Sequence, residues 1–144
     1  MSNYQKQGRG GGRDYDRPQV DHQKMTHYYD DQGLLKREVF IEWPREVVAA
    51  LDRQKDKRTN LRRAFDHVSA LQFRIQMKEG SAESVLGPGI PKLYRFVEYQ
   101  KQRDVISDQM KTFIQTHCNA VQHDEKKFEG FYQLFQSVLA YLGR

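Results

Sequence analysis

The stretch from Arg58 to Lys78 constrains the fold of this chain more than any other. At helical pitch its apolar residues form one stripe about 120° wide, and a row of cationic residues forms a second stripe. This pattern predicts a long helix that builds a core with one side and presents positive charge with another. The apolar stripe holds Leu61, Ala64, Phe65, Val68, Leu71 and Ile75, and the cationic stripe holds Arg63, His67, Arg74 and Lys78.

Caps and breakers divide the chain from Pro44 onward into further helices. Pro44 suits the first position of a helix that ends near Arg53, and Thr59 is predicted to cap the long helix, which Gly80 ends. Residues 80–91, rich in Gly and Pro, are predicted to form a loop with at most one helical turn. Further helices are predicted over residues 91–103, 107–121 and 124–144. The expected fold class is therefore all-α, a single bundle of five or six helices over residues 44–144.

The last predicted helix is apolar over more than half of its circumference. A helix of this kind is either buried between neighbours or partly covered by another subunit. The residues concerned are Phe128, Phe131, Tyr132, Leu134, Phe135, Val138, Leu139, Tyr141 and Leu142.

The chain before the bundle is predicted to contain two different segments. Residues 1–24 contain Val20 as their one branched aliphatic residue, so they cannot bury enough surface to offset the entropy of ordering and are expected to be disordered. Arg9 and Arg13 among glycines are compatible with a tail that holds RNA loosely, although a solubilising tail is favoured. Residues 25–43 are expected to form an irregular arm on the helices, with a short extended piece near residues 39–43.

Charge and composition narrow the class of partner. The net charge is +5, and the excess lies in residues 44–103. Such a localised basic surface favours a polyanionic partner, with nucleic acid first and an acidic membrane second. No apolar run reaches the roughly 18 residues that span a bilayer, and the single cysteine, Cys118, fits a reducing cytoplasm. We therefore expect a cytoplasmic protein without a membrane partner.

Catalytic and metal-binding patterns find little support. His117 falls on an apolar stripe, where a core histidine is the better interpretation, and it points well away from Cys118. A zinc site assembled from these two residues and His123 lacks the usual ligand spacing. We therefore predict no catalytic residues, no cofactor and no metal.

The helix over residues 91–103 carries a second basic row, formed by Lys92, Arg95, Tyr99 and Arg103. Exposed cations are usually just solvated, but two consecutive helices here carry such rows without acidic neighbours on them. Arginines can bind phosphates in bidentate fashion, and the Tyr99 ring can stack on an unpaired base or sugar. Contact with the RNA backbone, independent of sequence, is the function that these rows predict. Arg62 lies off the first row, with Asp66 as its predicted partner one turn away.

Three segments also match a known family. They are Thr59–Arg63 (TNLRR), Tyr99–Arg103 (YQKQR) and Phe128–Tyr141 (FEGFYQLFQSVLAY), and in this order they resemble the small helical subunit of the type III-A CRISPR effector, the Csm complex. The resemblance covers about residues 45–144. The chain departs from the family pattern at Gln102 and Leu139, and residues 1–43 have no counterpart.

The resemblance implies a small, non-catalytic, all-α subunit. Several copies would stack beside the guide RNA–target RNA duplex, held by other Csm subunits and by self-association into a dimer or filament. It places Arg62, Arg63, Tyr99 and Arg103 at the target RNA, and Arg74, Lys78, Lys92 and Arg95 join them on geometric grounds. Two alternatives stay open, the small subunit of the type III-B (Cmr) effector and a helical module that docks an acidic protein.

Overall fold

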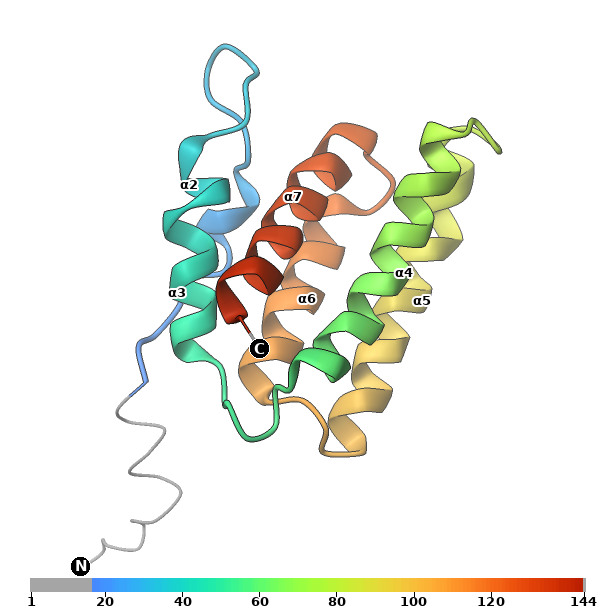
Figure 1. Cartoon of the computed structure of the whole chain (residues 1–144). Helices are drawn as coiled ribbons and strands as arrows, with labels where there is room; N and C mark the ends of the chain where they lie inside the picture. The colour runs from blue at the N-terminus through green and yellow to red at the C-terminus, as the bar shows by residue number, and fades with distance from the viewer. Residues whose placement is uncertain (1–16, 144) are drawn as a thin grey trace, which may run out of the picture.

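The computed structural model describes residues 17–143, and these residues form an all-α bundle, which confirms the predicted fold class (Figure 1). Within them the only strand-like pairing is a single bridge between Tyr29 and Leu35. The longer helices are α4 (Arg58–Gln76), α5 (Ala82–Gln102), α6 (Asp108–Val121) and α7 (Glu125–Leu142). Shorter elements precede them: the 3-10 helix η2 (Lys24–Thr26), α2 (Arg37–Phe40) and α3 (Glu42–Ala50).

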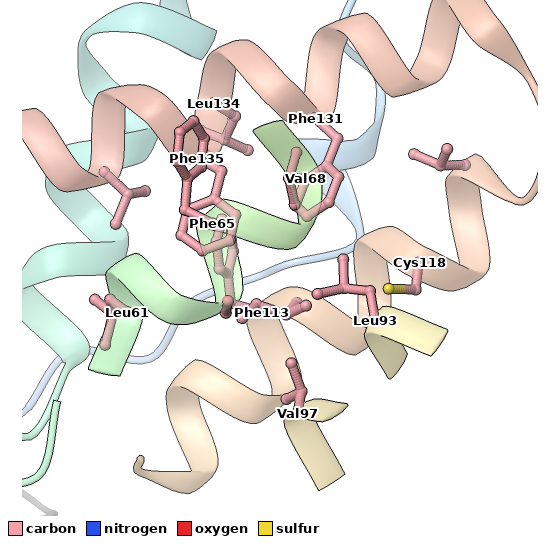
Figure 2. Close-up of a cluster of buried hydrophobic side chains, with 14 of the residues drawn as sticks. Leu61, Phe65, Val68, Leu93, Val97, Phe113, Cys118, Phe131, Leu134 and Phe135 are labelled. Atoms are coloured by element: carbon pink, nitrogen blue, oxygen red, sulfur yellow. The ribbon is translucent and has the colours of Figure 1, made fainter. Parts of the chain in front are cut away.

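Helix α7 is the centre of the bundle and packs against every other named element. The three phenylalanines Phe128, Phe131 and Phe135 are fully buried, and Figure 2 shows the last two among core residues from α4, α5 and α6. The wide apolar face of α7 is thus covered within the chain itself. Of the two alternatives for this helix, burial between neighbours is the one observed, so it gives no support to a docking module.

Helix α4 confirms the predicted two-sided helix. Its apolar stripe is buried, with Ile75 partly exposed at the end. Its ends differ from the prediction: the N-cap is Lys57, so Thr59 is already inside the helix, and the helix ends at Gln76, before Gly80. Helix α4 therefore begins without a capping side chain.

The loop predicted over residues 80–91 is wrong, because α5 runs unbroken from Ala82 and contains both Pro88 and Pro91. The Ser81 hydroxyl accepts a hydrogen bond from the Ser84 amide and starts the helix. Each proline removes one backbone hydrogen bond, and burial of the apolar side of this first half offsets that loss. At Gly89 a Cβ atom would lie 2.5 Å from Leu71 Cδ2, so this glycine lets α4 and α5 approach closely.

Residues before Pro44 are more regular than the sequence indicated. The predicted disordered tail falls largely on residues 1–16, which lie outside the described residues. Val20 and His22, which the sequence also assigned to the tail, pack on the core. In the segment predicted as an irregular arm, Met25 and Tyr28 are buried, and the end of α2 and the start of α3 occupy the stretch that was expected to be extended.

The short extended piece expected near residues 39–43 is helical. Val39 and Trp43 lie four residues apart and both face the core, whereas a strand would place Ile41 with them. Helix α3 begins at Glu42, so Pro44 lies inside its first turn and is not its first residue. A proline is tolerated there because the first amides of a helix have no partner within it.

A buried carboxylate ties two loops together at one end of the bundle. Asp56 accepts hydrogen bonds from the Ser107 amide at 2.8 Å, the Ser107 hydroxyl at 2.6 Å and the Asp52 amide at 2.9 Å. Burial raises the pKa of Asp56, and these bonds act against that shift. Ser107 in turn caps α6, so Asp56 fixes the α3–α4 loop against the start of α6.

Candidate nucleic-acid interface

All eight residues predicted to bind RNA are exposed, and they come from α4, α5 and the residues that directly follow them. The two helices are neighbours in the bundle. The eight residues are Arg62, Arg63, Arg74, Lys78, Lys92, Arg95, Tyr99 and Arg103. Which of them share one surface depends on how α4 and α5 are aligned.

Two contacts fix that alignment. The His67 ring packs on Phe96 with 4.5 Å between centroids, and the side-chain amide of Gln100 donates a hydrogen bond to the backbone carbonyl of Asn60 at 3.1 Å. The helices therefore run antiparallel, with the His67–Phe96 pair in the crease between them. The half-buried Phe96 ring packs against the core and forms the floor of this crease.

Five of the eight residues line the crease. Relative to His67, Arg63 lies four residues before and Arg74 seven after. Relative to Phe96, Lys92 lies four before, Tyr99 three after and Arg103 seven after. Residues at these spacings share one side of a helix. We call this surface the α4–α5 ridge: Arg63, Arg74, Lys92, Tyr99 and Arg103.

The other three residues differ in position. Arg62 stands next in sequence to Arg63, and neighbouring helix residues point about 100° apart. Arg95 lies three residues after Lys92 and four before Tyr99, at the outer border of the ridge. Lys78 follows α4 in a left-handed conformation, with φ of 56°. It lines a surface groove with Glu129 and other acidic residues at the start of α7. Arg62 and Lys78 thus lie off the ridge, and Arg95 lies at its border.

Most cations of the ridge have no carboxylate close by, and Arg74 is the exception. Arg74 Nε lies 3.8 Å from Glu79 Oε1, so the prediction of a row without acidic neighbours is wrong at this position. Within residues 17–143, Arg63 and Lys92 form no ion pair. The predicted pair between Arg62 and Asp66 is likewise not formed.

Tyr99 and Arg103 form a preorganised unit on α5. Arg103 Nη1 donates to the Tyr99 hydroxyl at 3.2 Å, and the guanidinium lies 5.6 Å from the centroid of the Tyr99 ring. The ring itself is 54% exposed. A flat aromatic face beside a fixed cation can hold a phosphate and a base or sugar together.

Cations away from the ridge are largely engaged inside the protein. Arg58 donates to the carbonyls of Leu139 and Gly143, and Arg53 donates to that of Leu142, so both satisfy the C-terminal end of α7. Other lysines pair with carboxylates: Lys55 with Asp104, Lys101 with Asp108, and Lys111 with Glu98. The capping role of the two arginines was not predicted, because it joins residues more than 80 positions apart.

The candidate metal ligands do not come together. His117 is fully buried, as predicted for a core histidine, and burial lowers its pKa to about 3. Burial raises the pKa of Cys118 to about 12, and exposed His123 lies 3.6 Å from Glu83. In the part of the chain that the structure describes, no three His, Cys, Asp or Glu side chains are grouped to hold a metal. No helix there has both the length and the apolar character that crossing a bilayer requires.

A family model described as Csm2 Type III-A matches residues 36–142, from the start of α2 to the end of α7. The chain belongs to this family. It is a small subunit of the type III-A Csm complex, so the type III-B alternative is set aside. Searches of curated proteins and of solved structures give no match. The matched region of this Csm2-family chain contains the whole α4–α5 ridge.

Proposed function

We propose that this Csm2-family subunit is a non-catalytic RNA-binding protein that holds the backbone of target RNA on the α4–α5 ridge. The proposal depends on one observation: Arg63, Tyr99 and Arg103 lie along the same crease. Within the described residues, no carboxylate forms an ion pair with either arginine. Cations in this arrangement attract phosphates and release their counterions.

The contact is indifferent to sequence. Guanidinium groups bind phosphate oxygens, which carry no base identity, and the Tyr99 ring can stack on any base. Helices α4 and α5 present no element shaped to enter a groove and read base edges. Such binding suits a subunit whose target is chosen by a guide RNA, because base pairing then supplies the specificity.

In the cytoplasmic effector, several copies lie along the guide RNA–target RNA duplex, and other Csm subunits hold them there. Membership in the Csm2 family and the positive ridge support this arrangement. The burial of Cys118 and His117 also agrees with a subunit that binds RNA and does not cleave it. These side chains are the candidate nucleophile and base, and His117 is hydrogen-bonded to Tyr28 inside the core.

The test is fluorescence anisotropy of a labelled single-stranded RNA of mixed sequence, measured over a series of salt concentrations. With about four phosphates neutralised, log K should fall with log salt with a slope of roughly −3. Arg63→Glu combined with Arg103→Glu should weaken binding strongly and make the slope shallower. Unchanged RNA binding by this double variant would overturn the proposal.

A matched control stands next to Arg63 in the sequence. Arg62 is also exposed and on α4, but it points about 100° away from the crease. Arg62→Glu changes the net charge of the protein as much as Arg63→Glu does. We expect the Arg63 variant to lose more affinity, and equal losses would contradict the ridge as the binding surface.

A further inference from the structure

A pocket lies between α5 and α6, on the side of α5 that faces away from the α4–α5 ridge. Its volume is about 700 Å³, and sites for small molecules typically measure about 300–1,000 Å³. Tyr94, which lines it, follows Lys92 of the ridge by two residues, which is about 200° around the helix. The pocket and the ridge are therefore separate surfaces. Both helices line the pocket, with Gly87, Ile90, Pro91 and Tyr94 on α5 and with Asn119 and Gln122 at the end of α6.

Contacts on both sides of the pocket fix its two walls against each other. The Gln115 side chain on α6 donates to the Tyr94 carbonyl at 3.3 Å and to Glu98 Oε1 at 3.2 Å. On the other side, His123 Nδ1 lies 3.6 Å from Glu83 Oε2. The pocket is thus formed before a ligand arrives, and a preformed site loses little freedom on binding.

The walls suit a flat apolar ligand. The side chains of Ile90 and Cys118 are each 3% exposed and close the inner end of the pocket. Burial raises the pKa of the Cys118 thiol to about 12, so this inner end carries no charge. The Tyr94 ring is 38% exposed and can stack on an aromatic ligand.

Polar groups at the pocket have hydrogen-bonding capacity to spare. Pro91 has no N–H, so the Gly87 carbonyl four residues earlier lacks its usual helical donor. The side-chain amide of Asn119 forms no hydrogen bond within residues 17–143. Gln122 Nε2 donates to the Asn119 carbonyl at 3.3 Å, which leaves Gln122 Oε1 as a further acceptor. The pocket therefore offers acceptors and one side-chain amide that both donates and accepts.

We propose that this pocket binds an adenine base, which stacks on Tyr94 and forms hydrogen bonds with Asn119 and Gly87. An asparagine amide pairs with adenine in bidentate fashion, accepting from the N6 amino group and donating to N7. The second hydrogen of that amino group is then left for the Gly87 carbonyl. Guanine carries an oxygen in place of this amino group, so it would leave the carbonyl without a donor.

Calorimetric titration of the full chain with adenosine monophosphate (AMP) tests the site, and guanosine monophosphate (GMP) is the comparison. We expect saturable binding of AMP and at least roughly tenfold weaker binding of GMP. Asn119→Ala and Tyr94→Ala should each weaken AMP binding about tenfold, whereas Tyr94→Phe keeps the ring and should keep the affinity. Absence of saturable AMP binding at millimolar concentration, or equal affinity for GMP, would overturn the adenine site.

Each of these alanine variants has a matched control outside the pocket. Tyr141 on α7 is 39% exposed, nearly the same as Tyr94, and Tyr141→Ala should leave AMP binding unchanged. Thr112 is exposed on α6 two turns before Asn119, and Thr112→Ala should likewise have no effect. If a control variant loses as much affinity as its partner in the pocket, the base does not bind there.

Two RNAs of equal length, oligo(A) and oligo(U), distinguish a base supplied by RNA from a free nucleotide. If an adenosine of RNA enters the pocket, oligo(A) binds more tightly than oligo(U), and Asn119→Ala removes the difference. Equal affinity for both RNAs, together with AMP binding, assigns the pocket to a free nucleotide.

The ridge variant separates this site from the proposed RNA surface. Arg63→Glu combined with Arg103→Glu should weaken binding of oligo(U) and leave AMP binding unchanged, because neither arginine lines the pocket. Loss of AMP binding in this double variant would place the nucleotide on the ridge and overturn the pocket. Unchanged binding of oligo(U) would overturn the ridge and leave the pocket standing.

Discussion

The buried imidazole of His117 makes the stability of this fold depend on pH. The ring stacks on Phe131 with 5.2 Å between centroids and an angle of 8° between planes, and Nδ1 lies 2.5 Å from the Tyr28 hydroxyl. Desolvation lowers the pKa of His117 from 6.5 to about 3, and nearby His22 adds to the shift. The neutral imidazole is therefore the form that the folded protein holds.

Whether the free energy of unfolding rises or falls with pH depends on which state, folded or unfolded, binds the proton. Between pH 6.5 and about 3 the unfolded chain binds a proton at His117 and the folded protein does not. The free energy of unfolding is therefore highest above pH 6.5 and falls by about 1.4 kcal/mol for each unit below it. The loss reaches about 2 kcal/mol near pH 5 and about 4 kcal/mol near pH 3, where the folded protein also begins to bind the proton.

Urea unfolding followed by circular dichroism at several values between about pH 8 and pH 5 measures this loss. The comparison protein carries Tyr28→Phe together with His117→Phe, because replacing both partners leaves no buried hydrogen-bonding group unpaired. His22, whose pKa burial also lowers, is present in both proteins. We expect the double variant to lose about 2 kcal/mol less than the wild type over this range.

The exposed His123 provides the control, and His123→Gln should keep the wild-type pH dependence. If the Tyr28→Phe, His117→Phe variant loses as much free energy between about pH 8 and pH 5 as the wild type does, His117 is not the group that titrates. A wild-type protein whose stability stays constant over this range would refute the reasoning as well.

Three further predictions concern packing and buried hydrogen bonds, and thermal or urea unfolding measures each. Gly87→Ala should stabilise α5 by about 0.5–1 kcal/mol, because a Cβ there meets nothing within 4 Å, whereas Gly89→Ala should destabilise it by about 1–3 kcal/mol through contact with Leu71. Gly130→Ala should also destabilise the protein, since its Cβ would lie 2.3 Å from an atom of the Tyr28 ring, and a melting temperature equal to that of the wild type would contradict this packing. Asp56→Ala leaves three hydrogen-bond donors without their acceptor and should cost about 3 kcal/mol, whereas a loss below about 1 kcal/mol would show that water replaces the carboxylate.

Periodicity was sufficient to predict α4, α6 and α7, because their apolar residues recur at helical spacing along the whole length of each helix. It failed for the first half of α5, where Pro88 and Pro91 have a local cost that only tertiary packing offsets. Residues 25–43 were unreadable for a related reason. Tyr28 finds its partner at His117, 89 positions later, and no local pattern encodes that contact.

The candidate site, like the fold, could be predicted only in part from the sequence. Each basic row could be read from its own helix, but the rows become one surface only through the His67–Phe96 contact between helices. That contact places Arg63 on the shared surface, whereas Arg62, which lies off the first row in the sequence, points away from it. The ion pair of Arg74 with Glu79 depends on how the chain turns after α4, which spacing alone did not reveal.

The position of α7 explains why the ridge can exist on α4 and α5. Because α7 packs against every other named element, it supplies three of the five buried phenylalanines in residues 17–143 and leaves α4 and α5 with only one side each to bury. The outer crease between them is then free to carry like charges, whose repulsion costs little in water and at physiological salt. A phosphate backbone lying in that crease would remove the repulsion, so the uncompensated charge favours the bound state.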